Sequence, residues 1–99
     1  MKIIQVVPRR NNKLKLKTLL DQKERELRGS STFVRQRAGR WMHKRYPGWI
    51  NWDEVSGGIL VVEIQSRVAD AEWQLLRAFI GYLDRHFSEQ IESVTITYR

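Results

Sequence analysis

Hydrophobic and polar positions follow two kinds of pattern in this chain, with a period of two near both ends and a helical period between them. Residues 2–7 are rich in β-branched side chains and stop at Pro8, which predicts a strand followed by a polar turn. Residues 91–98 alternate apolar side chains with serine and threonine, which predicts a strand with one dry and one wet face. Both ends of the chain are therefore expected in a sheet.

Two segments carry apolar residues at helical spacing. In residues 16–28 four leucines fall on one stripe, and a glycine follows the last of them. The alternation of Leu14 and Leu16 also fits the end of a strand, so the first residue of this helix is left open. Residues 71–87 carry a broad apolar stripe, which predicts a long helix with Asp70 as its cap.

A further helix is predicted over residues 33–46. The hydroxyl groups of residues 30–32 are suited to cap its first turn, and Pro47 and Gly48 are suited to end it. At about 100° per residue, this helix would turn an apolar face to the core and a basic face to solvent.

The strongest strand pattern lies at residues 59–65, where both faces are apolar, as in an interior strand. A preceding strand over 49–55 would reach it through a turn at 56–58. Helix 71–87 would then join it to strand 91–98 as a right-handed crossover between parallel strands, if both lie in one sheet. The expected fold class is α+β, a single two-layer domain over 1–99 of approximate order β-α-α-β(-β)-α-β, with helices packed on a small mixed sheet.

Charge divides the chain into two halves. Residues 1–50 contain 14 Lys and Arg against three acids, a net charge of +11, while residues 51–99 contain four Arg against eight acids, a net charge of −4. A concentrated positive field accelerates encounter with polyanions, although solvated helix faces also account for such charge. The sequence therefore points to a nucleic-acid partner without specifying one.

Several function classes lack the residues they need. The absence of cysteine excludes disulfides and thiolate-based metal or redox sites. The apolar stretch after Met1 is too short for a signal peptide, and no run is long enough for a membrane helix, so we expect a soluble, cytoplasmic protein that does not bind membranes. Gly57 and Gly58 lack the residues that complete a phosphate loop. We expect no cofactor, no metal site and no catalytic constellation.

The predicted basic helix supplies the candidate site. Arginine forks bind phosphate oxygens, and aromatic rings beside cations stack on bases, although tryptophans equally fill the core of a small domain. We therefore predict a small nucleic-acid-binding accessory or regulatory protein with a ridge on the helix, a basic loop and two neighbouring aromatics. These candidate residues are Arg37, Arg40, Lys44 and Arg45, then Arg9, Arg10, Lys13 and Lys15, and finally Trp41 and Trp49.

Two alternatives remain open at this stage. The chain could be a protein-interaction module, an adaptor or inhibitor whose basic half docks an acidic partner or the acidic half of a second copy, as a homodimer. It could also be a small basic ribonuclease in which His43 acts as general base. Trp73 and Ile80 widen the apolar arc of helix 71–87, and we expect other helices of the chain to cover them, with a partner as the alternative.

Overall fold

The computed structural model describes residues 1–99 and contains six strands, two α-helices and one short 3₁₀ turn. In chain order they are β1 (Lys2–Pro8), α1 (Leu16–Leu27), β2 (Phe33–Arg37), β3 (Arg40–His43), β4 (Trp49–Glu54), η1 (Ser56–Gly58), β5 (Leu60–Gln65), α2 (Ala69–Phe87) and β6 (Ile91–Tyr98). The α+β class is confirmed, and the elements predicted at 16–28, 49–55, 59–65, 71–87 and 91–98 are all present.

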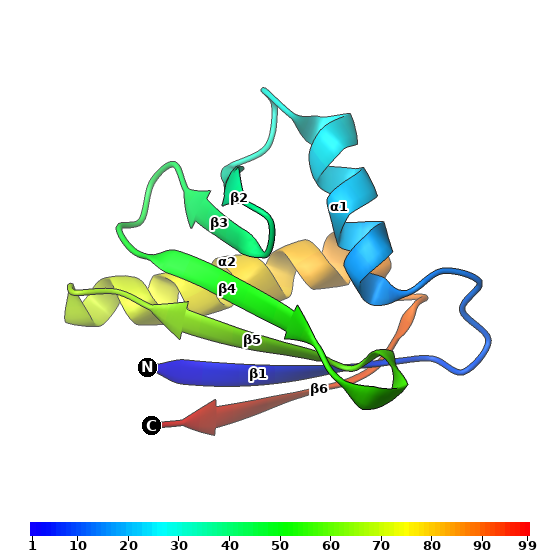
Figure 1. The fold of residues 1–99 in the computed structure, drawn as a ribbon. Coiled ribbons are helices and arrows are strands. Elements are labelled where there is room, and N and C mark those ends of the chain that lie inside the picture. The colour runs from blue at the N-terminus through cyan, green and yellow to red at the C-terminus, as the bar shows by residue number, and fades with distance from the viewer.

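One six-stranded sheet has the order β2-β3-β4-β5-β1-β6, and every pair of neighbours is antiparallel (Figure 1). β5 and β6 run parallel to each other, as expected for the ends of a crossover, but β1 lies between them. The expectation of a small mixed sheet is thus corrected, because the N-terminal strand inserts into the crossover and converts each contact into an antiparallel ladder.

The predicted helix 33–46 is wrong, since this segment forms the hairpin β2–β3. Ser31 Oγ accepts a hydrogen bond from the Phe33 amide at 3.1 Å, so the hydroxyls shape a turn before a strand instead of capping a helix. Gly39 adopts a φ of +73°, which suits a hairpin turn and is unfavourable within a helix. A Cβ atom there would lie 2.9 Å from the Trp52 carbonyl oxygen.

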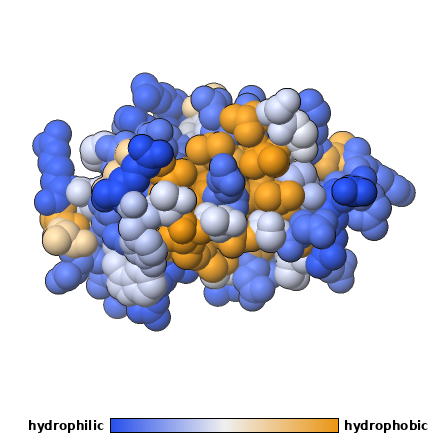
Figure 2. All heavy atoms as spheres, turned by 90° about the horizontal axis from the view of Figure 1, so that it is seen from below, coloured by the Kyte–Doolittle hydropathy of each residue, from blue (hydrophilic) through white to orange (hydrophobic).

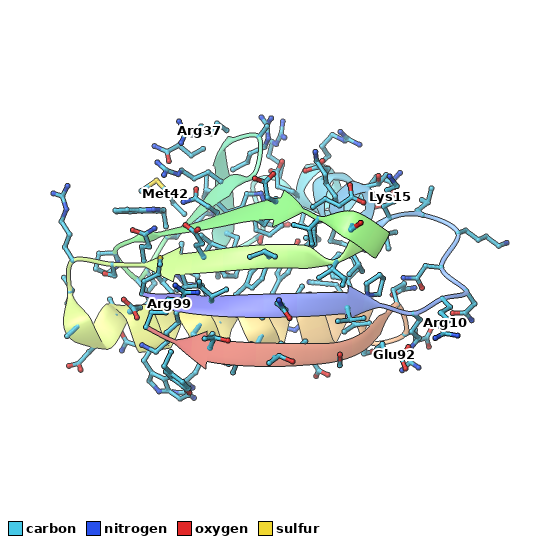
Figure 3. The ribbon with its side chains drawn as sticks, turned by 60° about the horizontal axis from the view of Figure 1, so that its bottom comes forward. Arg10, Lys15, Arg37, Met42, Glu92 and Arg99 are labelled. Atoms are coloured by element: carbon cyan, nitrogen blue, oxygen red, sulfur yellow. The ribbon has the colours of Figure 1, made fainter.

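Both helices lie on one face of the sheet and leave the other face open (Figures 1 and 3). α2 packs against β5, and α1 contacts β2. Along β1, β4 and β5 the buried side chains alternate with more exposed ones, and they belong to one core of 17 buried residues between the layers. Asp70 lies inside the first turn of α2 and not at its cap, because the helix begins at Ala69.

Aromatic side chains fill the core beneath the hairpin. Trp41 is fully buried, and its ring centroid lies 4.4 Å from that of Trp52, 5.4 Å from Tyr82 and 5.9 Å from Phe33. Edge-to-face packing at these distances stabilises more than the buried area alone. The hairpin is therefore held by core packing, although most of its residues are exposed.

The loop after β3 depends on a single glycine. Gly48 has a φ of +126°, and a Cβ atom there would lie 2.3 Å from the carbonyl oxygen of Gln65 and 2.7 Å from Leu75 Cδ1. Only glycine lets the backbone pass this closely between β5 and α2. Gly48, which was expected to help end a helix, thus ends a loop between two strands.

Neither α1 nor α2 combines the length and the apolar character that crossing a bilayer requires.

Candidate nucleic-acid interface

The hairpin and its flanks form a segment rich in cations, which we call the cationic hairpin and define as residues 28–45. No acidic residue occurs between Leu27 and Trp52. The cations of this segment take part in one ion pair only, that of Arg28. They are Arg28, Arg35, Arg37, Arg40, Lys44 and Arg45, of which all but the half-buried Arg40 are exposed.

A hollow of about 440 Å³ lies between the end of α1 and β2, and cations line it. Arg28 comes from the end of α1, Arg35 from β2 and Lys44 from the segment after β3. The backbone amide of Lys44 donates to the carbonyl of Thr32 at 2.9 Å, which fixes the end of the hairpin beside the start of β2. Cations from the end of α1, from β2 and from the segment after β3 thus converge around one open concavity.

One buried acid lies in this hollow, and its charge is compensated. Glu24 is 5% exposed and accepts two hydrogen bonds from the guanidinium of Arg28, one of them 3.0 Å long between Nε and Oε2. These bonds outweigh the cost of burial and lower the pKa of Glu24, with smaller contributions from the charges of Arg28, Arg35 and Arg25. Glu24 therefore positions Arg28, while Arg35 and Lys44 stay without an ion pair.

Arg40 and Trp49 form a pair on the open face of the sheet. The guanidinium carbon of Arg40 lies 5.3 Å from the centroid of the Trp49 ring, and Arg40 Nε donates to Asn51 Oδ1 at 2.6 Å. These contacts hold the guanidinium flat against the sheet. Trp49 is half-buried beneath it, so this ring already has a planar cation as its neighbour.

His43 lies at the end of β3 and serves a local structural role. Its Nδ1 accepts hydrogen bonds from the backbone amides of Arg45 at 3.0 Å and Tyr46 at 3.3 Å, and its ring stacks on Tyr46 with centroids 4.7 Å apart. Burial, followed by the charge of Arg45, lowers its pKa. Because the Nδ1 lone pair is engaged, the neutral ring carries its proton on Nε2 and has no free lone pair for a general base.

The basic loop of residues 9–15 forms a second, separate cluster. It borders a hollow of about 720 Å³ shared with η1 and one of about 440 Å³. Lys15 lies 3.6 Å from a carboxylate oxygen of Glu54, whereas Arg9, Arg10 and Lys13 have no ion pair. Arg10 and Arg37 lie at opposite corners of the molecule (Figure 3).

The structure thus distributes the predicted site residues over three locations. Arg37, Arg40, Lys44 and Arg45 stay together on the cationic hairpin, while the loop cations gather beside η1. Trp41 lies in the core and has no surface for stacking on a base. The ridge predicted from the sequence did not include Arg28 and Arg35. These two residues come close to each other because α1 packs against β2.

No cluster of three potential metal ligands occurs among the His, Asp and Glu side chains. The chain matches no protein-family model, and neither the curated proteins nor the solved structures contain one that is significantly similar to it.

Proposed function

We propose that this protein binds nucleic acid and that the cationic hairpin is its contact surface. The observation that carries the proposal is the convergence of Arg28, Arg35 and Lys44 on one hollow, beside the exposed arginines of a two-stranded ribbon. The hairpin is the outer part of the sheet and pairs with β4 only at Arg40 and Trp41. Two paired strands fit the major groove of duplex DNA, and arginines along them reach the phosphates on either side. The ribbon replaces the recognition helix that the sequence suggested.

The electrostatics of the hairpin support contacts to phosphates. Arg35, Arg37 and Lys44 carry no intramolecular ion pair, so binding an anion displaces no internal partner. Each phosphate they neutralise releases condensed counterions, which is the main source of sequence-independent affinity. The fixed Arg40 contributes a guanidinium that is already oriented, at little further cost in side-chain entropy.

A salt titration with a matched control tests the proposal. Duplex DNA, single-stranded DNA and single-stranded RNA are titrated with the wild-type chain, with Arg35→Ala/Arg37→Ala, and with Arg67→Ala/Arg85→Ala. Both variants remove two exposed arginines, but Arg67 and Arg85 lie outside the cationic hairpin. We expect only the hairpin variant to flatten the slope of log affinity against log salt, by about 0.9 per lost contact on duplex DNA.

Two results would overturn this function. Equal losses of affinity in the two variants would show that net charge alone attracts the nucleic acid. No binding even at low salt would favour an acidic protein as the partner of the basic surface. A third variant, Arg9→Ala/Arg10→Ala, measures the loop cluster independently. Because this cluster lies away from the hairpin, we expect its contribution to add to that of the hairpin and not to replace it.

A further inference from the structure

The strand at the other edge of the sheet, β6, has an unpaired side. β6 bonds only to β1, and the amide of Arg99 donates to the carbonyl of Met1 at 3.1 Å. Because amides in an antiparallel strand alternate in direction, those of Val94, Ile96 and Tyr98 point away from β1. A row of free backbone donors and acceptors thus follows the length of this edge.

Nothing in the sequence of β6 protects this edge. Residues 93–98 contain no charge, no proline and no glycine, and most of them are β-branched or aromatic. Natural edge strands are usually blocked by lysine, proline or a bulge. The one irregularity in the pairing with β1 lies at the beginning of β6, next to Pro8, and leaves the rest of the strand regular. Such a strand is suited to pair with another strand.

A strip of alternating apolar and charged residues on α2 continues this edge. Trp73, Arg77, Ile80 and Asp84 recur at helical spacing on one side of α2, and a hollow of about 270 Å³ lies between Ile80, Asp84 and β6. Trp73 is 47% exposed, so no helix of the chain covers it, contrary to expectation. Figure 2 shows apolar residues in the middle of the open sheet face and further ones beside them toward α2.

The charges along this surface are arranged to complement themselves. Glu92 lies near the beginning of β6, and Arg99 directly follows its other end (Figure 3). A twofold axis reverses the order of this pair, so each of the two charges meets its opposite in an identical chain. A partner of uniform charge would match only half of them. The surface therefore fits a second copy best.

We propose that two copies of this chain associate through β6, which adds antiparallel to the same strand of the second copy and forms one sheet across the dimer. With the axis near Thr95, Glu92 of each copy lies close to Arg99 of the other. The two α2 strips then face each other and cover Trp73 and Ile80. This association does not use the cationic hairpin, so it is separate from the surface we propose for nucleic acid.

The test is sedimentation equilibrium of the full chain over a concentration series into the millimolar range. We expect the wild type to rise from the monomer mass of 11.8 kDa to twice that value. Thr95 is exposed and lies near the proposed axis, so Thr95→Lys brings a positive charge on each copy close to the same charge on the other. This change should weaken the dimer by about tenfold or more. Gln36→Lys adds the same charge on β2, the other edge strand, and should leave the dimer unchanged.

Charge reversal keeps the proposal testable even if one variant folds poorly. Glu92→Lys and Arg99→Glu should each weaken the dimer, whereas the double variant should restore it, because it re-creates both pairs in reversed order. Circular dichroism of each variant checks the monomer fold. A wild type that remains monomeric throughout, a Thr95→Lys variant that associates like the wild type, or a double variant without recovery would each overturn the proposal.

Discussion

β2 and β6 are the two edge strands of one sheet, and they present opposite surfaces. β2 and its flanks carry a series of cations without an acid, while residues 93–98 of β6 carry no charge at all. Beneath β2 lies the aromatic cluster around Trp41, whereas β6 covers the core only at its margin, with Val94 36% and Tyr98 65% exposed. One edge is anchored from below and charged outside, and the other is lightly packed and uncharged between Glu92 and Arg99.

The difference in charge between the two edge strands determines what each of them can bind. Like charges on β2 repel a second copy of the same strand, so this edge is blocked against self-association yet attracts polyanions. β6 lacks that protection, and its free backbone groups are available for pairing. The cations of the hairpin are therefore separated in space from the surface we assign to dimerisation, because β2 and β6 lie at opposite edges of the sheet.

The largest expected effect is a difference in the free energy of unfolding between variants at the two edges of the sheet. Trp41→Ala removes the centre of the aromatic cluster and should lower the free energy of unfolding by about 3–5 kcal/mol. Val94→Ala on β6 removes a partly exposed side chain and should cost about 1 kcal/mol or less. Urea unfolding followed by circular dichroism measures both. Similar costs at the two positions would contradict the proposed difference in anchoring.

An intermediate effect is expected at the buried acid below the cationic hairpin. Glu24→Gln weakens the hydrogen bonds to Arg28 and should cost about 1 kcal/mol at neutral pH, because the exposed Arg28 is partly screened by solvent. Since the pKa of Glu24 is lowered by folding, its contribution is present above pH 4.5 and is lost as the pH falls through the folded value.

DNA binding provides a second test of the Glu24→Gln variant. Glu24→Gln removes one negative charge beside the hollow, so duplex DNA should bind at least as tightly as it does to the wild type. Glu89→Gln, the same change at an exposed acid outside the hollow, should leave stability nearly unchanged. Weaker DNA binding by the Glu24 variant would contradict this expectation and would show that the position of Arg28, held by the carboxylate, matters more than the net charge of the hollow.

The smallest effect is a dependence of stability on pH near neutrality. Burial lowers the pKa of both His43 and His86, with neighbouring cations adding to it. Their contribution is therefore complete above the ordinary pKa of about 6.5 and is lost as the pH falls through the folded values. The midpoint of thermal unfolding should fall by a few degrees between pH 7 and pH 5. β6 carries no histidine, so its edge does not change charge through this mechanism.

His43→Gln separates the two histidines, because glutamine offers an oxygen to the same backbone amides without titrating in this range. The variant should retain only the part of the pH dependence that belongs to His86. A wild-type midpoint that is constant or rises between pH 7 and pH 5 would be inconsistent with the lowered pKa values.

Local patterns were sufficient to predict most elements. The apolar stripe of α2 and the alternation of β6 identified these two segments, because each period recurs over many residues. The hairpin was missed because Val34, Ala38 and Trp41 also satisfy a helical period. Gly39 was the local signal against that helix, but the decisive contribution is the packing of Trp41 on residues distant in sequence.

The candidate site could be predicted only as a concentration of charge. The sequence grouped Arg37 with Arg40 because they are close along the chain, and the two do pair across the hairpin. It could not bring Arg28 to Arg35 and Lys44, because that requires α1 to lie against β2. Nor could it separate the loop cations from the hairpin, since their positions follow from the sheet order.

The central place of β1 has a consequence for folding. β1 is the first strand in the chain, yet its two neighbours are β5 and β6, so both of its ladders join residues more than 50 positions apart. Ladders of such high contact order form slowly, because the chain must close long loops before any of these contacts stabilises it. During synthesis β1 emerges first and remains unpaired, with Ile4 and Val6 uncovered, until β5 and then β6 have left the ribosome.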